Sequence, residues 1–169
     1  MAEQREGEVA LKEDPAGMSS DAGLIFIGRI RSPWQTRGEC PKNMVAARAT
    51  GRQATLAIDP PYRPGLRGLA GVSHIVVLSW LGEGARNLII QKPRHAAEAK
   101  GVFALRSPVR PNPIGLHVVG LVYLDEAAGL LTLDAIDALD GTPVVDIKPY
   151  FASTESFPEA MPPRHRDAP

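Results

Sequence analysis

Residues 106–115, with the sequence RSPVRPNPIG, hold two arginines and an asparagine among three prolines. Each proline fixes φ and removes a backbone donor, and each residue before a proline is pushed toward extended geometry. The segment is therefore predicted to be a stiff extended loop rather than a helix or a central strand. Guanidinium groups on such a loop can bind an anion or a carboxylate. A structural turn with solvated arginines explains these residues equally well.

Asp134, Asp137 and Asp140 recur at every third position, at the end of one predicted strand and in the turn after it. Carboxylates brought together could hold a ribose, bind a cationic ligand or accept a proton. The alternative is ordinary turn chemistry, in which aspartates cap backbone amides. Asp146 and Lys148 follow in the next strand, where a simple ion pair would explain them.

The other reactive residue types do not form a site by spacing alone. The histidines are far apart in the sequence and there is one cysteine, so we expect no metal site. His74 is a better candidate for a catalytic base than His117, although a satisfied polar residue at a strand entry explains either. Cys40 as a nucleophile would need a base brought near by folding. Residues 82–87 begin like a dinucleotide fingerprint but have Asn87 in place of the third glycine, which indicates a sharp turn instead.

The composition favours one loop-rich domain with β structure. The chain has 169 residues, with 16 glycines, 16 prolines and only 5% aromatic residues. The single cysteine excludes an internal disulfide and suits a reducing cytoplasm. No apolar stretch approaches the ~20 residues of a membrane span, and the polar N-terminus does not resemble a signal peptide.

The net charge of zero conceals an asymmetry between the N-terminus and the rest of the chain. Residues 1–21 hold six acids and two bases, which leaves 17 bases and 13 acids in the remainder. The first 21 residues have low hydrophobicity and no periodicity, so we predict a disordered acidic tail. The mildly basic body permits contact with nucleic acid without establishing it.

The segments that must position these residues read as short strands with little helix. Seven strands are predicted, at residues 24–30, 54–58, 75–81, 101–105, 117–124, 130–136 and 143–147. Residues 34–52 are predicted to be a long loop, and residues 63–71 an irregular helical turn. The expected architecture is mainly β: a single sheet closed as a barrel over residues 22–156, with a flexible tail at 157–169.

Three segments together resemble a known family. Residues 27–33, 101–115 and 139–150 are similar to the TsaA-like, TrmO-type methyltransferases, and the likeness extends over roughly residues 24–156. The resemblance implies a single-sheeted β-barrel that binds S-adenosylmethionine without a Rossmann fold. It also implies a homodimer with the cofactor near the subunit interface. The reaction it implies is methylation of N6 of threonylcarbamoyladenosine beside the tRNA anticodon.

Carried over by position, the family's cofactor contacts come from four separate segments of the chain. The expected cofactor-binding residues are Lys42, Asn43, Met44, Gly82, Glu83, Arg106, Leu116, Asp134, Ala135, Ile136 and Asp137. Arg106 would pair with the methionine carboxylate, and carboxylates would hold ribose hydroxyls or the amino group. The chain departs from the family in having Lys42-Asn43 where Arg-Gln is common, and in ending soon after the barrel.

The acceptor nitrogen of such a reaction is ureido-like, so a base that removes its proton would make it a better nucleophile. The candidates for that base are Asp137, Asp140, Asp146 and His74. Arg37, Arg110 and Lys148 are expected to contact phosphate. Two alternatives stay open: a methyltransferase of the same fold with a small acceptor, and a non-enzymatic module in which residues 108–111 act as a polyproline ligand.

Overall fold

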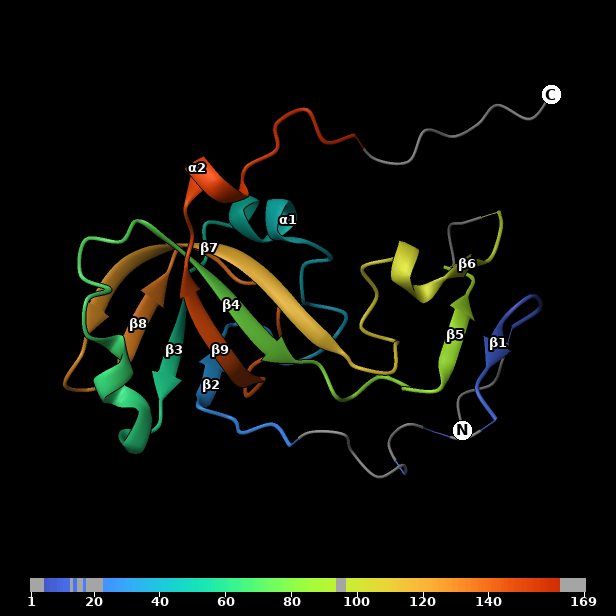
Figure 1. Cartoon of the computed structure of the whole chain (residues 1–169), viewed down its shortest axis with the longest axis horizontal. Coiled ribbons are helices and arrows are strands. Elements are labelled where there is room, and N and C mark those ends of the chain that lie inside the picture. Colours follow the sequence, from blue (N-terminus) through green and yellow to red (C-terminus); the bar gives the residue numbers. More distant parts are fainter. Residues whose placement is uncertain (1–4, 13, 15–16, 18–22, 94–96, 162–169) are drawn as a thin grey trace.

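The computed structural model describes residues 5–12, 14, 17, 23–93 and 97–161, and its centre is a closed barrel (Figure 1). The barrel strands are β2 (Gly28–Arg31), β3 (Ala54–Ile58), β4 (His74–Trp80), β7 (Ile114–Asp125), β8 (Leu130–Leu133) and β9 (Pro143–Pro149). Their order around the barrel is β2-β3-β8-β7-β4-β9, and every neighbouring pair is antiparallel. The prediction of a single closed sheet is confirmed, with six strands in place of seven.

Alternating side chains fill the barrel interior. In β3, Ala54, Leu56 and Ile58 point inward, and on β8 Leu131 and Leu133 are fully buried. This period of two is what a strand with one face in the core requires. β4 is buried at three consecutive positions from residue 75 to residue 77, as its almost continuous apolar sequence predicted.

A second, smaller sheet lies beside the barrel (Figure 1, right) and accounts for the missing seventh strand. It consists of β1 (Val9–Ala10), β5 (Leu88–Gln91) and β6 (Lys100–Gly101), in the order β1-β5-β6. The prediction of a barrel strand at 101–105 is wrong. Only its first residue pairs, with β5, and η2 (Val102–Ala104) then forms a 3₁₀ turn. The turn buries Val102 but leaves Phe103 82% exposed, because within the described residues no partner strand covers the apolar residues 102–105.

The small sheet uses residues that the sequence assigned to other structures. β5 was not predicted, and β1 falls within the predicted acidic tail. Glu8 accepts hydrogen bonds from the backbone amides of Lys92 and Arg5, at 3.0 and 3.1 Å, and these bonds lower the pKa of its carboxyl. The other predicted tail residues lie mostly outside the described part, as do residues 162–169.

Short helices complete the fold. α1 (Met44–Ala49) lies within the predicted long loop, so that prediction is wrong for these six residues. Its N-cap is Asn43, whose Oδ1 accepts a hydrogen bond from the Ala46 amide at 2.9 Å. η1 (Pro60–Leu66) matches the predicted irregular turn in kind, and α2 (Ala152–Glu155) follows the last strand. The predicted strand 130–136 ends at Leu133, so the prediction is wrong for its last three residues.

Candidate functional site

A cleft of about 1380 Å³ opens between the barrel wall and the loops at one end of it. Its walls come from residues 37–45, the segment after β4, the proline-rich loop, the start of β7 and residues 137–143. Long-range pairing brings these segments together, because β4 pairs with both β7 and β9. The cleft is therefore assembled from four parts of the chain that are far apart in the sequence.

The proline-rich loop is irregular up to Ile114, where β7 begins, as the prolines predicted. Arg110 holds the loop in shape, since its Nη2 donates to the carbonyls of Val102, at 2.6 Å, and Leu105. Arg86 Nε donates to the Pro111 carbonyl at 2.7 Å from the other side. Arg110 is thus engaged with the backbone, which does not favour the phosphate contact expected from the sequence.

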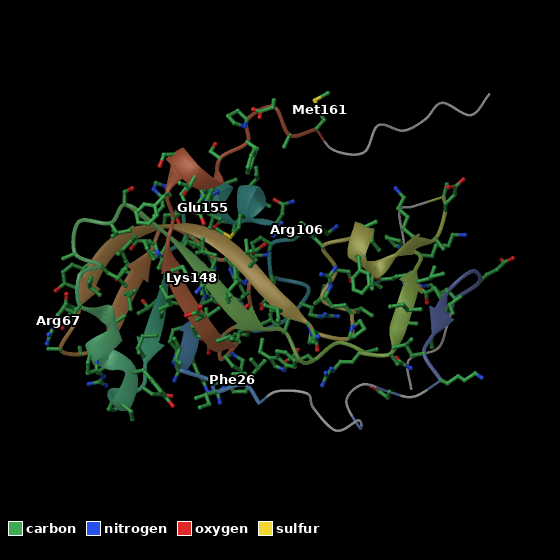
Figure 2. All side chains as sticks on the ribbon, in the orientation of Figure 1. Phe26, Arg67, Arg106, Lys148, Glu155 and Met161 are labelled. Carbon is green, nitrogen blue, oxygen red and sulfur yellow. The ribbon has the colours of Figure 1, made fainter. Side chains whose placement is uncertain are left out.

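Arg106 is the exposed arginine of this loop and lines the cleft. Figure 2 shows it between the barrel and the small sheet. Its Nη2 donates to the Leu116 carbonyl at 3.2 Å, which orients the guanidinium along the cleft wall and leaves other donors available. This arrangement suits a carboxylate or phosphate ligand.

The three aspartates of the 134–140 segment go to different places. Asp137 and Asp140 line the cleft, and Asp134 does not. Asp134 pairs with Arg48 of α1 at 2.9 Å, and its other oxygen accepts from the Gly120 amide at 2.8 Å. Asp134 therefore fastens α1 to the barrel wall.

The residues between these aspartates are also structural. Ala135 and Ile136 are buried in the core, and the Ile136 carbonyl accepts from Trp34 Nε1 at 2.8 Å. The side chains of Asp134, Ala135 and Ile136 face the core or α1 and do not line the cleft, so the cofactor contact expected of these residues stays a prediction for their backbone atoms.

Asp140 and Asp146 are each engaged elsewhere. Asp140 Oδ1 accepts from the Ser32 amide at 3.0 Å at the edge of the cleft. Asp146 lies outside the cleft and pairs with Lys148 at 2.7 Å, which raises the pKa of the lysine. Asp140 Oδ2 also lies 3.9 Å from Arg31 Nη1, so within the described residues both oxygens of Asp140 have a partner, whereas one oxygen of Asp137 does.

Asp137 is joined to a buried histidine that the sequence had ranked low. His117 Nδ1 lies 2.6 Å from Asp137 Oδ1, and His117 Nε2 lies 2.9 Å from Ser79 Oγ. His74, the preferred candidate from the sequence, is exposed, and its Nδ1 lies 3.1 Å from the Ser73 hydroxyl. The signal that could have identified His117 is a polar residue on the buried face of a strand, since such a residue needs a partner.

The loop that follows β2 carries the remaining polar wall. Glu39 accepts hydrogen bonds from the Thr36 hydroxyl and backbone amide and from the Gln35 amide, which lowers the pKa of its carboxyl. This closed turn presents Arg37 and Cys40 to the cleft. Burial and the negative charge of nearby Asp137 raise the pKa of Cys40 to about 11. The thiol is therefore protonated at neutral pH and is a poor nucleophile.

The segments carried over from the family also reach the cleft. Lys42, Asn43 and Met44 line it from α1, and Gly82 and Glu83 line it from the turn after β4. Any larger residue at Gly82 would displace the Trp80 ring, because a Cβ would lie 2.6 Å from Trp80 Nε1. Several apolar side chains around the cleft are exposed: Val45, Phe103, Ile114 and Leu116.

Comparison with known proteins explains this assembly. The family described as the tRNA-methyltransferase O N-terminal domain matches residues 29–156, which is most of the chain. The protein belongs to the TrmO family. The match spans all six barrel strands except the first residue of β2, together with every wall of the cleft.

Two relatives are each 37% identical to this chain over the residues that align. The chain is 37% identical over 145 residues to a probable S-adenosyl-L-methionine-binding protein, VirR, of Rhizobium radiobacter, covering 86% of this chain and 78% of VirR. It is 37% identical over 140 residues to the tRNA (adenine(37)-N6)-methyltransferase of Escherichia coli K12, covering 79% of this chain and 60% of that enzyme.

The solved TrmO structures agree with the fold. A crystal structure of TrmO from Pseudomonas aeruginosa superposes with a TM-score of 0.68 at 34% identity over 86% of this chain, and another TrmO with a TM-score of 0.68 at 36% identity over 89%. This chain spans 62% and 65% of those two chains.

Two further features of the described residues bear on the site. They contain no group of three or more histidine, cysteine, aspartate or glutamate side chains able to hold a metal. Within the same part of the chain, none of the helices has the length and apolar character needed to cross a bilayer.

Proposed function

We propose that this protein is an S-adenosylmethionine-dependent methyltransferase that modifies N6 of a threonylcarbamoyl adenosine next to the anticodon of tRNA. The observation that carries the proposal is a cleft of a TrmO-family barrel in which Arg106, Asp137 and the 42–44 segment meet. Relatives with this domain are named as S-adenosyl-L-methionine-binding proteins and as a tRNA (adenine(37)-N6)-methyltransferase.

The cleft residues fit the chemical groups of S-adenosylmethionine. Arg106 supplies a cation for its carboxylate, and Glu83 supplies an anion for its ammonium group. Met44 and Leu116 offer apolar surface for the rest of the molecule. When bound, the cofactor would supply a methyl group activated by the positive charge on sulfur, and the protein's part is to align that methyl with the acceptor.

Asp137 is the preferred base for the acceptor nitrogen. It lines the cleft, and hydrogen bonding to His117 fixes its direction. Asp140 is a weaker candidate because the Ser32 amide occupies one of its oxygens and the Arg31 guanidinium lies 3.9 Å from the other, and Asp146 is weaker still because it lies outside the cleft. These three remain the aspartates to test, with His74 as a residue remote from the cleft for comparison.

Basic residues around the cleft support an RNA substrate. Arg29, Arg37 and Lys42 line it together with Arg106, and each can contact phosphate. A tRNA substrate implies action in the cytoplasm, and its backbone charge implies binding that weakens as salt rises.

A second copy of the chain would complete the cleft. Val45 and Phe103, at its rim, are 77% and 82% exposed, and Ile114 and Leu116 add to the same open apolar surface. Such a patch around a polar cleft is typical of an interface. We therefore propose a homodimer in which each subunit covers the other's cofactor cleft.

The alternative is a methyltransferase of the same fold that acts on a small acceptor. Two relatives that this chain covers to 78% and 91% of their own length are named for S-adenosyl-L-methionine binding alone, with no acceptor in the name. A polyproline ligand at residues 108–111 is less favoured, because Arg86 and Arg110 fasten that loop between η2 and β7.

The decisive experiment incubates the protein with methyl-labelled cofactor and tRNA that carries the threonylcarbamoyl modification. The matched control is the same tRNA without the modification. Label in modified tRNA alone supports the proposal, whereas label in neither, with calorimetry still detecting cofactor binding, favours the small acceptor. Absence of cofactor binding by calorimetry would overturn the methyltransferase assignment.

A further inference from the structure

Three polar side chains form a continuous hydrogen-bonded chain beneath the floor of the cleft. Ser79 of β4 is fully buried, the His117 side chain of β7 is 5% exposed, and the Asp137 side chain is 18% exposed. Ser79 and His117 come from paired strands, and Asp137 follows β8. Side-chain exposure therefore increases from serine through histidine to aspartate. His117 and Asp137 line the cleft and Ser79 does not, and Asp137 is the more exposed of the two that do.

The donors and acceptors of this chain can be assigned. Within the described residues, Ser79 Oγ has no hydrogen-bond partner except His117 Nε2. Its hydroxyl must donate to that nitrogen, because otherwise a fully buried O–H would have no acceptor. The imidazole proton then sits on Nδ1 and is donated to Asp137 Oδ1 at 2.6 Å. The direction of donation thus runs from serine through histidine to aspartate.

The same three residue types form the catalytic centre of serine hydrolases, but here the accessible end is reversed. Ser79 is covered by the backbone of Gly115, where an added Cβ would overlap Ser79 Oγ and lie 2.8 Å from His117 Nε2. No substrate can reach this hydroxyl, which excludes Ser79 as a nucleophile. The group presented to a ligand is the carboxylate.

We propose that Ser79 and His117 are positioning residues that hold the Asp137 carboxylate so that Oδ2 accepts the proton of the methyl acceptor. His117 occupies Oδ1, and among the described residues Oδ2 accepts no hydrogen bond. The inference rests on the proposed function for its substrate, and on the geometry alone for the hydrogen-bonded chain.

The proton balance agrees with this role. Methylation replaces an N–H bond of the acceptor by an N–C bond, while the electron pair of the broken S–C bond stays on sulfur. One proton is therefore released at the nitrogen, and Oδ2 takes it and passes it to water at the mouth of the cleft. The neighbouring Cys40 thiol, whose pKa is raised to about 11, adds no negative charge beside Asp137 at neutral pH.

The first test separates the donor at Nδ1 from the bulk of the ring. His117→Asn retains an N–H near the position of Nδ1, whereas His117→Leu removes it. We expect His117→Leu to lower the single-turnover rate at saturating cofactor about 100-fold, the usual contribution of a general base. We expect the single-turnover rate of His117→Asn to stay within about tenfold of the wild-type rate. The dissociation constant for the cofactor should change little in either.

His74→Leu is the matched control, because His74 is exposed and outside the cleft. Thermal unfolding of each variant identifies any that fail to fold, and Ser79→Ala, a smaller change at the far end of the chain, then replaces them. The proposal is overturned if the Asn and Leu variants lose equal rate, or if the whole loss lies in cofactor affinity.

The second test needs neither cofactor nor tRNA. In ¹⁵N-histidine-labelled wild-type protein, NMR should find His117 as the Nδ1–H tautomer with Nε2 unprotonated, and Ser79→Ala should allow both tautomers. A wild-type Nε2–H tautomer would overturn the inference whatever the substrate. Failure to methylate tRNA with the expected tautomer intact would overturn the proposed function while leaving the hydrogen-bonded chain in place.

Discussion

Asp134 and Asp137 are three positions apart, yet one belongs to the wall of the barrel and the other to the cleft. The segment that joins them follows the end of β8 and is not a strand, and its two consecutive middle residues, Ala135 and Ile136, are both buried. Asp134 faces α1 and is held by Arg48 and the Gly120 amide, whereas Asp137 faces the cleft and is held by His117. The difference teaches that a regular spacing of one residue type in a sequence does not define one site.

The comparison is tested most strongly by Asp137→Asn. We expect a loss of about 100-fold or more in single-turnover methylation, because the amide cannot take the acceptor's proton. Asp134→Asn should keep most of the activity, since that side chain does not reach the cleft. Rapid-quench assays of both variants with modified tRNA measure this, and equal losses would remove the distinction between the two aspartates.

The two arginines of the proline-rich loop provide the next contrast. Arg106→Ala should weaken cofactor binding about tenfold or more, because a charge-assisted hydrogen bond is worth roughly 1.5–3 kcal/mol. Arg110→Ala should instead lower thermal stability, because its guanidinium holds the Val102 and Leu105 carbonyls. Calorimetry with the cofactor and thermal unfolding separate the two outcomes. If Arg110→Ala lost cofactor affinity and Arg106→Ala lost stability, the roles assigned to the two arginines would be wrong.

Gly115→Ala tests the packing beneath Asp137. The added methyl would overlap Ser79 Oγ, so we expect a loss of about 1–3 kcal/mol in the free energy of unfolding. Ser79→Ala in the same chain should recover part of that loss by making room. Denaturant unfolding of the two single variants and the double variant measures the coupling free energy between positions 115 and 79. A coupling free energy of zero would mean that the added methyl does not meet Ser79.

Arg48→Ala, which removes the partner of Asp134, should lower the free energy of unfolding by less than Gly115→Ala does. The Arg48 and Asp134 side chains are 42% and 31% exposed, so solvent screening limits the pair to about 0.5–1 kcal/mol. The loss should shrink as salt is added, since the exposed pair is screened. Denaturant unfolding at low and high salt checks this, and a loss that does not depend on salt would point to packing of α1 instead.

The smallest effect is expected at Cys40. With its pKa raised to about 11, alkylation of the thiol should be slow at pH 7 and should rise with pH up to about that value. Asp137→Asn removes one cause of the raised pKa and should speed alkylation severalfold. Because the folded-state pKa is raised, the associated stability is present below pH ~9 and is lost toward pH 11. Iodoacetamide kinetics against pH test this, and an inflection below pH 9 would contradict it.

Local pattern predicted much of the barrel but little of what lies outside it. The period of two in β3 and the apolar run of β4 predicted their strands, and the prolines predicted the loop before β7. α1 was missed because six residues give too short a periodic signal. The run at 101–105 was assigned to the barrel because its composition suits a strand, although only pairing decides whether one forms.

For the site, resemblance identified the residues and folding decided which of them meet. Eight of the eleven expected cofactor residues line the cleft: Lys42, Asn43, Met44, Gly82, Glu83, Arg106, Leu116 and Asp137. The other three, residues 134–136, are taken up by the core and by α1. Whether the eight bind the cofactor is the prediction that the calorimetry tests.

By itself, the amino-acid sequence determined a mainly β domain and a rigid arginine-bearing loop, because alternation and the dihedral restrictions of proline act on neighbouring residues. The TrmO type of the barrel and the candidate cofactor residues came from the resemblance of three segments to that family. Only the tertiary structure decided that Asp137 joins His117 and Ser79 while Asp134 joins Arg48. Those partners are 20, 38 and 86 positions apart along the chain, and hydrogen bonds at that separation depend on strand register, which no local pattern encodes.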